Sequence, residues 1–355
     1  MHSLGYTPKK RELLVSPIFK TTFTLSGGPN LAFNYLEGDK SLRGNHYIHQ
    51  PCIRHWDSPQ VGDGKHLSFF NMLVTTSIEG FDRKTVFTHH LDYIKNHLGF
   101  DLNKIYATYF GGGDIKGMEF EADLEAKNIW LKLGIPENHI IVCKDKNLME
   151  AFVANSVEPV GGYRSELFYN INNSNPESID DFFKLEKKGG MLEFWTHVDY
   201  ICKVAVDENG NYSFEKFSTP VHAAGFGPQR VIRILENVER IEDISIFDKL
   251  KKCFPNNIKD SQAKSVVMDH MRGLVFLIND GAADLKGKKN RSRKYVFRKY
   301  AQHLRENFDK IVNSNDKDKT ITCLVGESIS LFSILFPEFI TKRDEILRKT
   351  LEVLG

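Results

Sequence analysis

Two strand-like arms, His46–Asp57 and Lys65–Gly80, constrain the fold of this chain more than any other part of its sequence. They flank a polar, glycine-containing loop, which is the pattern of an antiparallel hairpin. The first arm carries Arg54, and the second carries His66 and, four residues later, Phe70. An arginine and a histidine can hold phosphate oxygens, and the face of a phenylalanine accepts a purine. The arms therefore predict a nucleotide site on an antiparallel sheet.

Length, charge and cysteine spacing exclude several other classes of protein. At 355 residues the chain has room for one large or two medium domains, and its net charge of +2 favours neither nucleic acid nor membrane as an overall partner. No apolar run is long enough to span a membrane, and the N-terminal residues lack the apolar core of a signal peptide. The five cysteines are scattered without a CxxC pair. We expect a cytoplasmic protein with reduced thiols, no zinc site and no membrane partner.

Hydrophobic patterning predicts an α+β fold. Up to Glu79 the pattern is short and strand-like, and helices are expected at Arg83–Leu98 and Phe120–Leu133. Further strands are expected at residues 104–110, 140–143, 165–171, 192–206 and 212–221, and a helix at 229–237. This order lacks the strand–helix alternation of a doubly wound parallel sheet. We predict an antiparallel β-sheet flanked by helices in residues 1–240, followed by a helical domain in residues 241–355.

A nucleotide bound by this chain needs phosphate-binding groups other than a glycine-rich loop. There is no Walker loop and no GxGxxG after a strand, and the run Gly111–Asp114 lacks the Lys-Ser/Thr of a phosphate loop. The best candidates are Arg54 and Arg230, because arginine stays charged and presents a planar fork. Arg230 falls in the first turn of the helix after Gly225–Pro228, where unpaired N–H groups favour anions. Each arginine alone also fits a surface role, and Phe70 alone also fits the core.

Together these segments resemble the class II aminoacyl-tRNA synthetases. The hairpin is similar to their motif 2, in which an arginine holds the α-phosphate and a phenylalanine stacks on adenine. Those positions fall on Arg54 and Phe70, and His66 completes the site. The run GFGPQRVIRIL resembles motif 3, whose arginine contacts the γ-phosphate, and this arginine falls on Arg230, with Gly227 at the start of the helix. The resemblance implies ATP as the nucleotide and a catalytic role for both arginines.

Further blocks resemble the alanyl-tRNA synthetases in particular. CIR, VG and KHLSFFNML in the hairpin are similar to that group's arginine, VG and HHTFFEML runs. In the same order, SELFYN resembles SEIFYD, EFWTHV resembles EIWNLV, DHMRGLVFLINDG resembles DHIRSCAFLIADG, and YVFRK resembles YVLRR. The blocks cover roughly residues 13–305. Residues 241–355 are thus expected to resemble the start of the tRNA-recognition region.

The resemblance implies activation of a carboxylic acid by ATP. A carboxylate attacks the α-phosphorus, pyrophosphate leaves and an acyl-adenylate forms, while Mg²⁺ neutralises phosphate oxygens. Glu166 and Glu193, on neighbouring predicted strands, are candidates to bind the metal or to orient the site. The alternative for both carboxylates is an ordinary ion pair at a strand end.

The amino-acid side of the pattern departs from the alanyl-tRNA synthetases. Ala223 in HAAGFG replaces the aspartate of their VDTGMG run, which grips the substrate ammonium, and Thr196 replaces an asparagine that contacts the amino acid. The residues expected to line the substrate pocket are Val153, Arg164, Thr196, Val198, His222, Ala223 and Gly225. Loss of the aspartate removes a charge-assisted bond worth roughly 1.5–3 kcal/mol. We therefore expect another amino acid or a related carboxylic acid in preference to alanine, with Arg164 either facing an acidic group of the substrate or lying on the surface.

A basic run, residues 286–305, contains no acidic side chain. It is typical of a nucleic-acid contact, although a solvated charged face has the same pattern. The residues expected to contact tRNA are Lys288, Lys289, Arg291, Arg293 and Arg298. The chain ends before the editing and C-terminal domains of a full alanyl-tRNA synthetase, which favours a small-molecule or carrier acceptor over tRNA. The choice of acceptor stays open.

Two functions from different classes are compatible with these observations. The first is a ligase that forms an acyl-adenylate and transfers the acyl group to tRNA, or to a small molecule or carrier in a biosynthetic pathway. The second is a catalytically silent synthetase paralogue that binds tRNA or a protein as a regulator. The altered amino-acid pocket favours the second, and the retained nucleotide residues oppose it. Motif 1 is weak in the run GGPNLAF, so both a monomer and a homodimer are expected alternatives.

Overall fold

A computed structural model describes residues 1–15, 21–154, 159–256 and 258–355 of the chain. The chain forms two compact units, each assembled from several segments. The sheet unit comprises residues 1–11, 26–50 and 72–235, and the helical unit comprises residues 12–25, 51–71 and 236–355. The segment that carries Arg54, His66 and Phe70 therefore belongs to the helical unit.

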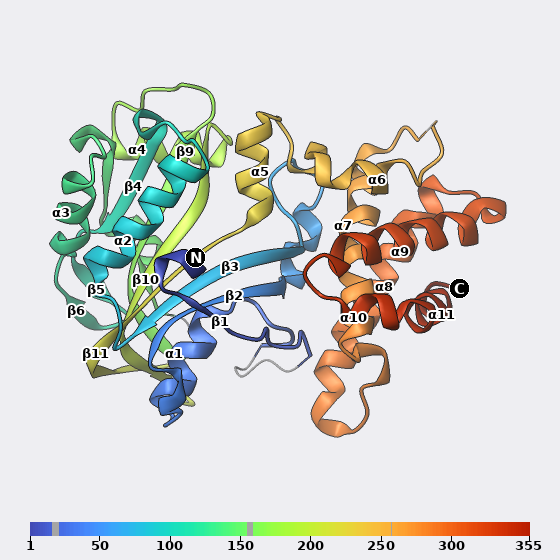
Figure 1. The fold of residues 1–355 in the computed structure, drawn as a ribbon, viewed down its shortest axis with the longest axis horizontal. Helices are drawn as coiled ribbons and strands as arrows, with labels where there is room; N and C mark the ends of the chain where they lie inside the picture. Colours follow the sequence, from blue (N-terminus) through green and yellow to red (C-terminus); the bar gives the residue numbers. More distant parts are fainter. Residues whose placement is uncertain (16–20, 155–158, 257) are drawn as a thin grey trace. The chain divides into compact units, whose positions relative to one another are not determined.

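The strands form one large sheet and a small hairpin (Figure 1). They are β1 (Thr7–Pro8), β2 (Gly44–Ile53), β3 (Phe69–Ile78), β4 (Ile105–Phe110), β5 (Gly113–Ile115), β6 (Met118–Phe120), β7 (Ile140–Cys143), β8 (Phe152–Val153), β9 (Val160–Asn170), β10 (Met191–Val206) and β11 (Tyr212–Phe226). In the described residues the large sheet has nine strands in the order β1-β2-β3-β11-β10-β9-β4-β7, with β8 beside β9. From β3 to β4 in this order, neighbouring strands are antiparallel. The α+β fold with a mainly antiparallel sheet is confirmed.

Helices α2 (Arg83–Asp92) and α3 (Leu124–Lys132) cover one face of the large sheet. The ring centroids of Phe87 on α2 and Trp130 on α3 are 4.5 Å apart, and both rings belong to a hydrophobic cluster with Trp195 of β10. Burial of such aromatic side chains contributes roughly 1.5–3 kcal/mol each. Because side chains alternate along a strand, the strand residues that alternate with those of this cluster lie on the opposite face of the sheet.

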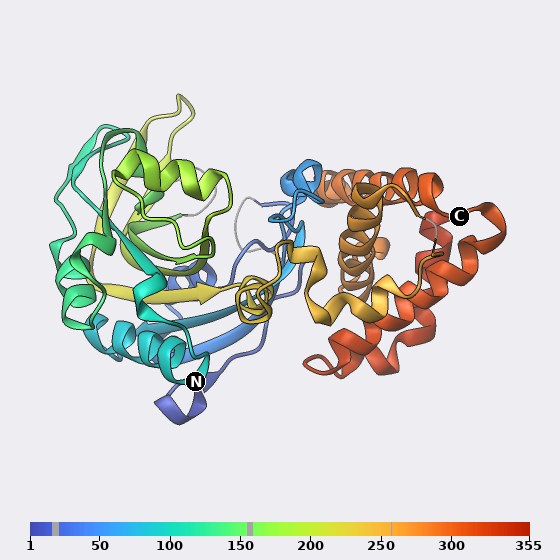
Figure 2. The same cartoon turned by 90° about the horizontal axis from the view of Figure 1, so that it is seen from above.

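Helices α1 (Gly28–Leu36) and α4 (Ile179–Lys187) pack on the opposite face. Helix α1 shares a cluster with Ala223 of β11, and Phe182 of α4 packs edge-on against Phe168 of β9. Figure 2 shows α2 and α4 on opposite sides of the strands. Helix α5 (Pro228–Glu236) follows β11 directly.

The helical unit is organised around a buried central helix, α7. Its helices are α6 (Asp248–Lys251), α7 (Ser261–Asn279), α8 (Arg291–Ile311), α9 (Lys317–Ser333), α10 (Glu338–Thr341) and α11 (Arg343–Leu354). From Ser265 to Asn279 every residue of α7 is buried, as expected for a helix surrounded by others. Phe276 packs against Phe332 of α9 and Phe339 of α10, with ring centroids 5.0 and 4.8 Å apart.

Helix α1 and one pair of cysteines differ from the sequence-based expectations. Residues 28–36 form helix α1 within a stretch expected to be strand-like, because Pro29 fits the first turn of a helix, where no N–H bond is lost. Residues 16–20 of that stretch lie outside the described residues. Cys253 and Cys323 form a disulfide, so the expectation of reduced thiols is wrong for this pair, since folding brings together cysteines 70 positions apart. Among the helices that the structure describes, none is long and apolar enough to cross a membrane.

Candidate functional site

Arg54 and Phe70 lie together near the ends of the hairpin arms. The guanidinium carbon of Arg54 is 5.0 Å from the centroid of the Phe70 ring, a cation–π distance. The N–H of Arg54 donates to the carbonyl of Ser68 at 2.9 Å, which fixes the register of the two arms. Both side chains are partly exposed, whereas the neighbouring Phe69 is fully buried. Among the described residues the Arg54 guanidinium has no ion-pair partner, so its charge is available to an anion.

His66 belongs to the same segment, but its side chain is already engaged. The Nδ1 atom of its ring lies 2.6 Å from Oδ2 of Asp63, and its backbone N–H donates to Oδ1 at 2.9 Å. Although burial opposes the shift, these hydrogen bonds lower the pKa of Asp63. A phosphate that binds His66 must therefore compete with the Asp63 carboxylate.

A buried ion pair on α7 holds the backbone next to Phe70. Asp269 accepts hydrogen bonds from the N–H groups of Ser68 and Phe69, both at 3.2 Å, and from the Ser68 hydroxyl. Arg272 donates to the carbonyl of Phe69 at 3.3 Å and to Asp269 at 3.1 Å. Asp269 and Arg272 are only 1% and 2% exposed. Although burial opposes the shift, the hydrogen bonds and charges around Asp269 lower its pKa, so it is held as a carboxylate.

Tyr300 of α8 extends this network. Its hydroxyl lies 2.9 Å from the Ser68 hydroxyl, and its ring stacks on His270 with centroids 4.2 Å apart. Nε2 of His270 in turn lies 3.1 Å from Nδ1 of His303. Gly273 permits this close approach, because a Cβ there would meet the Tyr300 hydroxyl oxygen at 2.3 Å. The start of β3 is thus joined to α7 and α8 by one polar network.

Asp269 and Arg272 were not among the site residues predicted from the sequence. Their signal is a pair of opposite charges three positions apart in a largely apolar stretch, which become neighbours on a helix and need a partner when buried. Asp269 contacts Ser68, 201 positions away in the sequence, and Arg272 contacts Phe69, 203 positions away, so spacing alone does not reveal these contacts.

In the sheet unit, strand register places most of the expected pocket residues on one face. Directly paired residues form two rows across β9, β10 and β11: Glu166–Thr196–Gly225 and Arg164–Val198–Ala223. Side chains two positions apart on a strand point to the same face. Both rows therefore lie on the face that α1 and α4 cover in part, opposite α2 and α3.

Arg230 and Glu193 form an ion pair beside these rows. The Nη1 atom of Arg230 contacts the Glu193 carboxylate and also donates to the Glu193 carbonyl at 3.0 Å. The Thr196 hydroxyl donates to the same carboxylate at 2.9 Å. Arg230 occupies the first turn of α5, where its own N–H donates to the Gly227 carbonyl. Arg230 lies in the helix turn that its sequence predicts, but its charge is neutralised by Glu193.

The two carboxylates of this face differ in their protonation. Burial raises the pKa of Glu166 to about 7, and the nearby Glu193 carboxylate adds to the rise, while Arg164 opposes it. Although burial opposes the shift, the Arg230 guanidinium and the Thr196 hydroxyl lower the pKa of Glu193. Glu193 is therefore the charged member at neutral pH, and Glu166 changes protonation near neutrality.

Arg164 is fixed by backbone carbonyls as well as by a carboxylate. Its Nε donates to the carbonyl of Glu150 at 2.6 Å and lies 3.4 Å from the Glu166 carboxylate, and Nη2 donates to the carbonyl of Met149 at 3.2 Å. These bonds hold the guanidinium over the loop before β8. The Arg164 side chain is 27% exposed, so it lies neither fully at the surface nor fully buried.

Ala223 lies where the first turn of α1 meets the sheet. A Cβ built on Gly28 would lie 3.6 Å from the Cβ of Ala223 and 3.7 Å from the hydroxyl of Tyr200. Thr76 of β3 is paired with Ala223, is buried, and its hydroxyl has no hydrogen-bond partner in the described part of the chain. The surroundings of Ala223 thus combine apolar carbon with one unsatisfied hydroxyl.

The remaining candidates of the sheet unit lie elsewhere. His222 is adjacent to Ala223 on β11 and points to the other face, where Nδ1 lies 2.5 Å from the Asp199 carboxylate. Asp199 also pairs with Arg83 of α2 at 2.6 Å, so a structural ion-pair network holds His222. Val153 of β8 is paired with Gly162 of β9.

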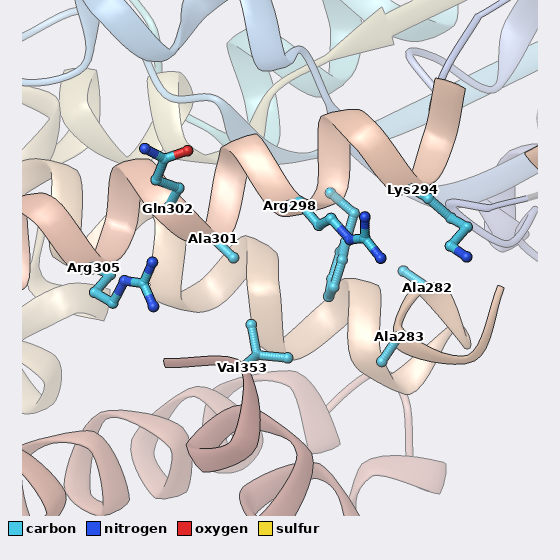
Figure 3. A pocket seen from close by; sticks show the side chains of 9 residues that line it. Ala282, Ala283, Lys294, Arg298, Ala301, Gln302, Arg305 and Val353 are labelled. Carbon is cyan, nitrogen blue, oxygen red and sulfur yellow. The ribbon is translucent and has the colours of Figure 1, made fainter. Parts of the chain in front are cut away.

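The expected tRNA-contact residues are spread over two elements of the helical unit. Lys288 and Lys289 lie in a short 3₁₀ turn, and Arg291, Arg293 and Arg298 lie on α8. The Nε atom of Arg293 donates to the carbonyl of Thr22 at 3.1 Å, so this side chain is already held by a backbone hydrogen bond. Figure 3 shows Arg298 among the residues that line a pocket along α8.

The residues that the structure describes contain no group of three or more His, Cys, Asp or Glu side chains arranged to hold a metal ion. Glu166 and Glu193 supply two carboxylates on one face, which matches a Mg²⁺ ion that takes one or two protein carboxylates and binds the phosphates of its nucleotide.

Comparison with known proteins identifies the family. Residues 34–352 match the model of the tRNA synthetases class II (A). The chain is 29% identical over 271 residues to the alanine–tRNA ligase of Candida albicans, covering 70% of this chain and 26% of that protein. It is 26% identical over 276 residues to the alanine–tRNA ligase of Borrelia hermsii, covering 75% of this chain and 44% of that protein.

The chain therefore spans between a quarter and just under half of these two relatives. Among solved structures, apo histidyl-tRNA synthetase of S. aureus matches 68% of this chain and 63% of its own, at 14% identity and a TM-score of 0.35. The family model covers most of the chain, in agreement with the hairpin and helix-start motifs described above. The chain belongs to the tRNA synthetases class II (A).

Proposed function

We propose that this chain activates an amino acid or a related carboxylic acid with ATP. A carboxylate oxygen of the acid attacks the α-phosphorus, the bond to the bridging oxygen of the β-phosphate breaks, and pyrophosphate leaves. The product is an acyl-adenylate. The observation that carries the proposal is the unpaired Arg54 guanidinium over the face of Phe70, within a family that uses such a hairpin.

The nucleotide contacts are assigned from the surroundings of each residue. Arg54 offers a permanent charge to a phosphate, and the partly exposed Phe70 ring offers a face to adenine. Asp269 and Arg272 keep the start of β3 in place without touching the ligand. A phosphate that binds Arg230 must compete with the Glu193 carboxylate for the guanidinium, and its binding would leave Glu193 available to a cation.

When Mg²⁺ binds together with ATP, it would neutralise part of the negative charge of the phosphates. Glu193 and Glu166 are the residues that would hold it. The raised pKa of Glu166 means that a cation must displace a proton from this carboxyl at or below neutral pH. Metal binding at this position is therefore expected to strengthen as the pH rises through about 7.

The acid substrate is proposed from the face around Ala223. No carboxylate occupies this position, and the Asp199 carboxylate of the neighbouring strand is engaged on the other face. An α-ammonium placed there would lose its charge partner, which disfavours alanine bound in the way of the alanyl-tRNA synthetases. The free Thr76 hydroxyl suits an uncharged polar group in its place.

The acceptor is tRNA or a small molecule or carrier, and we place the reaction in the cytoplasm with the chain as a monomer or homodimer. The basic residues of α8 favour tRNA. Acylation of added tRNA, and its sensitivity to ribonuclease, distinguishes the two acceptors.

The second candidate is a catalytically silent paralogue that binds tRNA or a protein. It is favoured by the pairing of Arg230 with Glu193 and of His66 with Asp63, which leaves two expected phosphate-binding side chains engaged. Acid-dependent exchange of pyrophosphate into ATP, measured over a panel of amino and carboxylic acids, separates the candidates. Exchange with any acid supports activation. ATP binding without exchange for every acid supports the silent paralogue.

A further inference from the structure

The helical unit contains a pocket of about 410 Å³ between α8, the turn at Ala282–Asp284 and α11 (Figure 3). Its floor is apolar and is formed by Ala282, Ala283, Phe297, Ala301 and Val353. Its polar lining is formed by three cations and one amide, namely Lys294, Arg298, Arg305 and Gln302. No acidic side chain lines it. A volume of this size holds a small organic molecule.

The three cations lie on one stripe of α8. Lys294, Arg298 and Arg305 are separated by four and seven positions, which places them on the same side of a helix with 3.6 residues per turn. At about 1.5 Å per residue, the stripe is roughly 16 Å long. Figure 3 shows Lys294 and Arg298 at one end, near Ala282, and Arg305 at the other end. The pocket therefore presents positive charge at both ends of an apolar floor.

These cations have no ion-pair or hydrogen-bond partner among the residues that the structure describes. Two cations of α11, in contrast, are in ion pairs: Lys349 pairs with Asp284 at 2.5 Å, and Arg348 pairs with Glu352 at 2.5 Å. Unpaired cations around a concave surface produce a positive potential that draws in anions. The positive charge of the pocket is thus not neutralised by ion pairs with the described residues.

The pocket is separate from the hairpin network. Tyr300 and His303 contact that network through the opposite side of α8, because they lie about half a turn from Arg298 around the helix axis. A ligand in the pocket therefore does not replace any contact of Arg54 or Phe70. The activation reaction proposed above does not require this pocket.

We propose that this pocket binds a phosphorylated nucleoside. A phosphate lies between Lys294 and Arg298, where an arginine fork and a lysine charge complement its oxygens. The base and ribose cover the apolar floor, and a second phosphate reaches Arg305. The same chemistry is offered by a free nucleotide and by one nucleotide unit of an RNA strand. The distance between the charged ends suits phosphates on both sides of a nucleoside better than a single inorganic phosphate.

The test is a binding titration of the full chain with adenosine 3′,5′-bisphosphate, inorganic phosphate and a short unstructured RNA oligonucleotide. The double variant Lys294→Gln/Arg298→Gln is compared with Lys299→Gln/Arg348→Gln, which removes the same charges outside the pocket. We expect the first to weaken bisphosphate binding roughly tenfold or more, and the second to leave it unchanged. Arg54→Ala is also expected to leave it unchanged, which separates this site from the ATP site.

The two sources of the ligand are separated by competition. If RNA displaces the bisphosphate at lower concentration, the site takes a strand; if free bisphosphate binds more tightly, it takes a nucleotide. The proposal is overturned if no probe binds, if both double variants weaken binding equally, or if inorganic phosphate competes as well as the bisphosphate. The last result would show that the apolar floor contributes nothing.

Discussion

Replacing Asp269 with alanine tests how the nucleotide hairpin is held. The change removes a carboxylate that accepts bonds from Ser68, Phe69 and Arg272, and leaves the Arg272 guanidinium buried without its charge partner. Breaking a buried pair from one side costs about 3–5 kcal/mol. Because a domain of this kind is stable by roughly 5–15 kcal/mol, we expect the variant to fold with a lower free energy of unfolding.

The measurement is urea unfolding of the wild type and of three variants. Asp284→Ala, which removes an exposed carboxylate paired with Lys349, is the matched control and should cost less than about 1 kcal/mol. The double variant Asp269→Leu/Arg272→Met removes both buried charges and should recover most of the loss. A positioning role also predicts a higher KM for ATP in Asp269→Ala, with the KM for the acid little changed.

The pH dependence of stability provides a second test of the role of Asp269. Since the pKa of Asp269 is lowered in the folded state, its stabilisation is present above the ordinary aspartate value of about 3.9 and is lost as the pH falls below it. The wild type and Asp269→Ala should therefore converge in stability in acid. A cost below about 1 kcal/mol for Asp269→Ala at neutral pH, or a double variant no more stable than Asp269→Ala, would refute the reasoning.

Three other predictions concern the two units separately. Arg54→Ala should raise the KM for ATP by about 10- to 100-fold in an exchange assay, because it removes a charged phosphate contact worth roughly 1.5–3 kcal/mol, while the exposed control Arg43→Ala should not. Because the pKa of Glu166 is raised from 4.5 to about 7, wild-type stability should fall as the pH rises between these values, and Glu166→Gln should remove this fall; an unchanged pH profile would count against it. Reduction of the Cys253–Cys323 disulfide, which spans 70 positions, should lower stability in urea by about 2–4 kcal/mol, and Cys253→Ser should be insensitive to reductant.

Periodicity predicted the elements whose boundaries are set by local sequence. The long strand β10 and helix α5 appear within one residue of their expected limits, because alternation and a proline at the helix start are local signals. The helix expected from Phe120 begins at Leu124, since the Asp123 side chain caps it by accepting the Ala126 N–H at 3.2 Å. Helix α1 was missed because its nine residues carry a glycine and a proline at the start, which also mark a turn.

The motifs predicted candidate site residues but not how their side chains pair in the structure. The hairpin resemblance predicted that Arg54 and Phe70 serve one site, and the structure places them in contact. It did not predict that Arg230 pairs with Glu193, which lies next to a bulge in β10 that has no sequence signature. Likewise the adjacent residues His222 and Ala223 face opposite sides of the sheet, which follows from strand alternation only once the strand is known to reach Phe226.

Direct detection of the acyl-adenylate tests the central claim most closely. The full chain is incubated with ATP, Mg²⁺ and a panel of amino and carboxylic acids, and bound nucleotides are identified by mass spectrometry. We predict an acyl-adenylate with at least one acid other than alanine, formed by the wild type and by Arg43→Ala, and by Arg54→Ala only at ATP concentrations about 10- to 100-fold higher. Recovery of only intact ATP with every acid, from a protein that binds ATP, would contradict the proposal that this chain activates an acid.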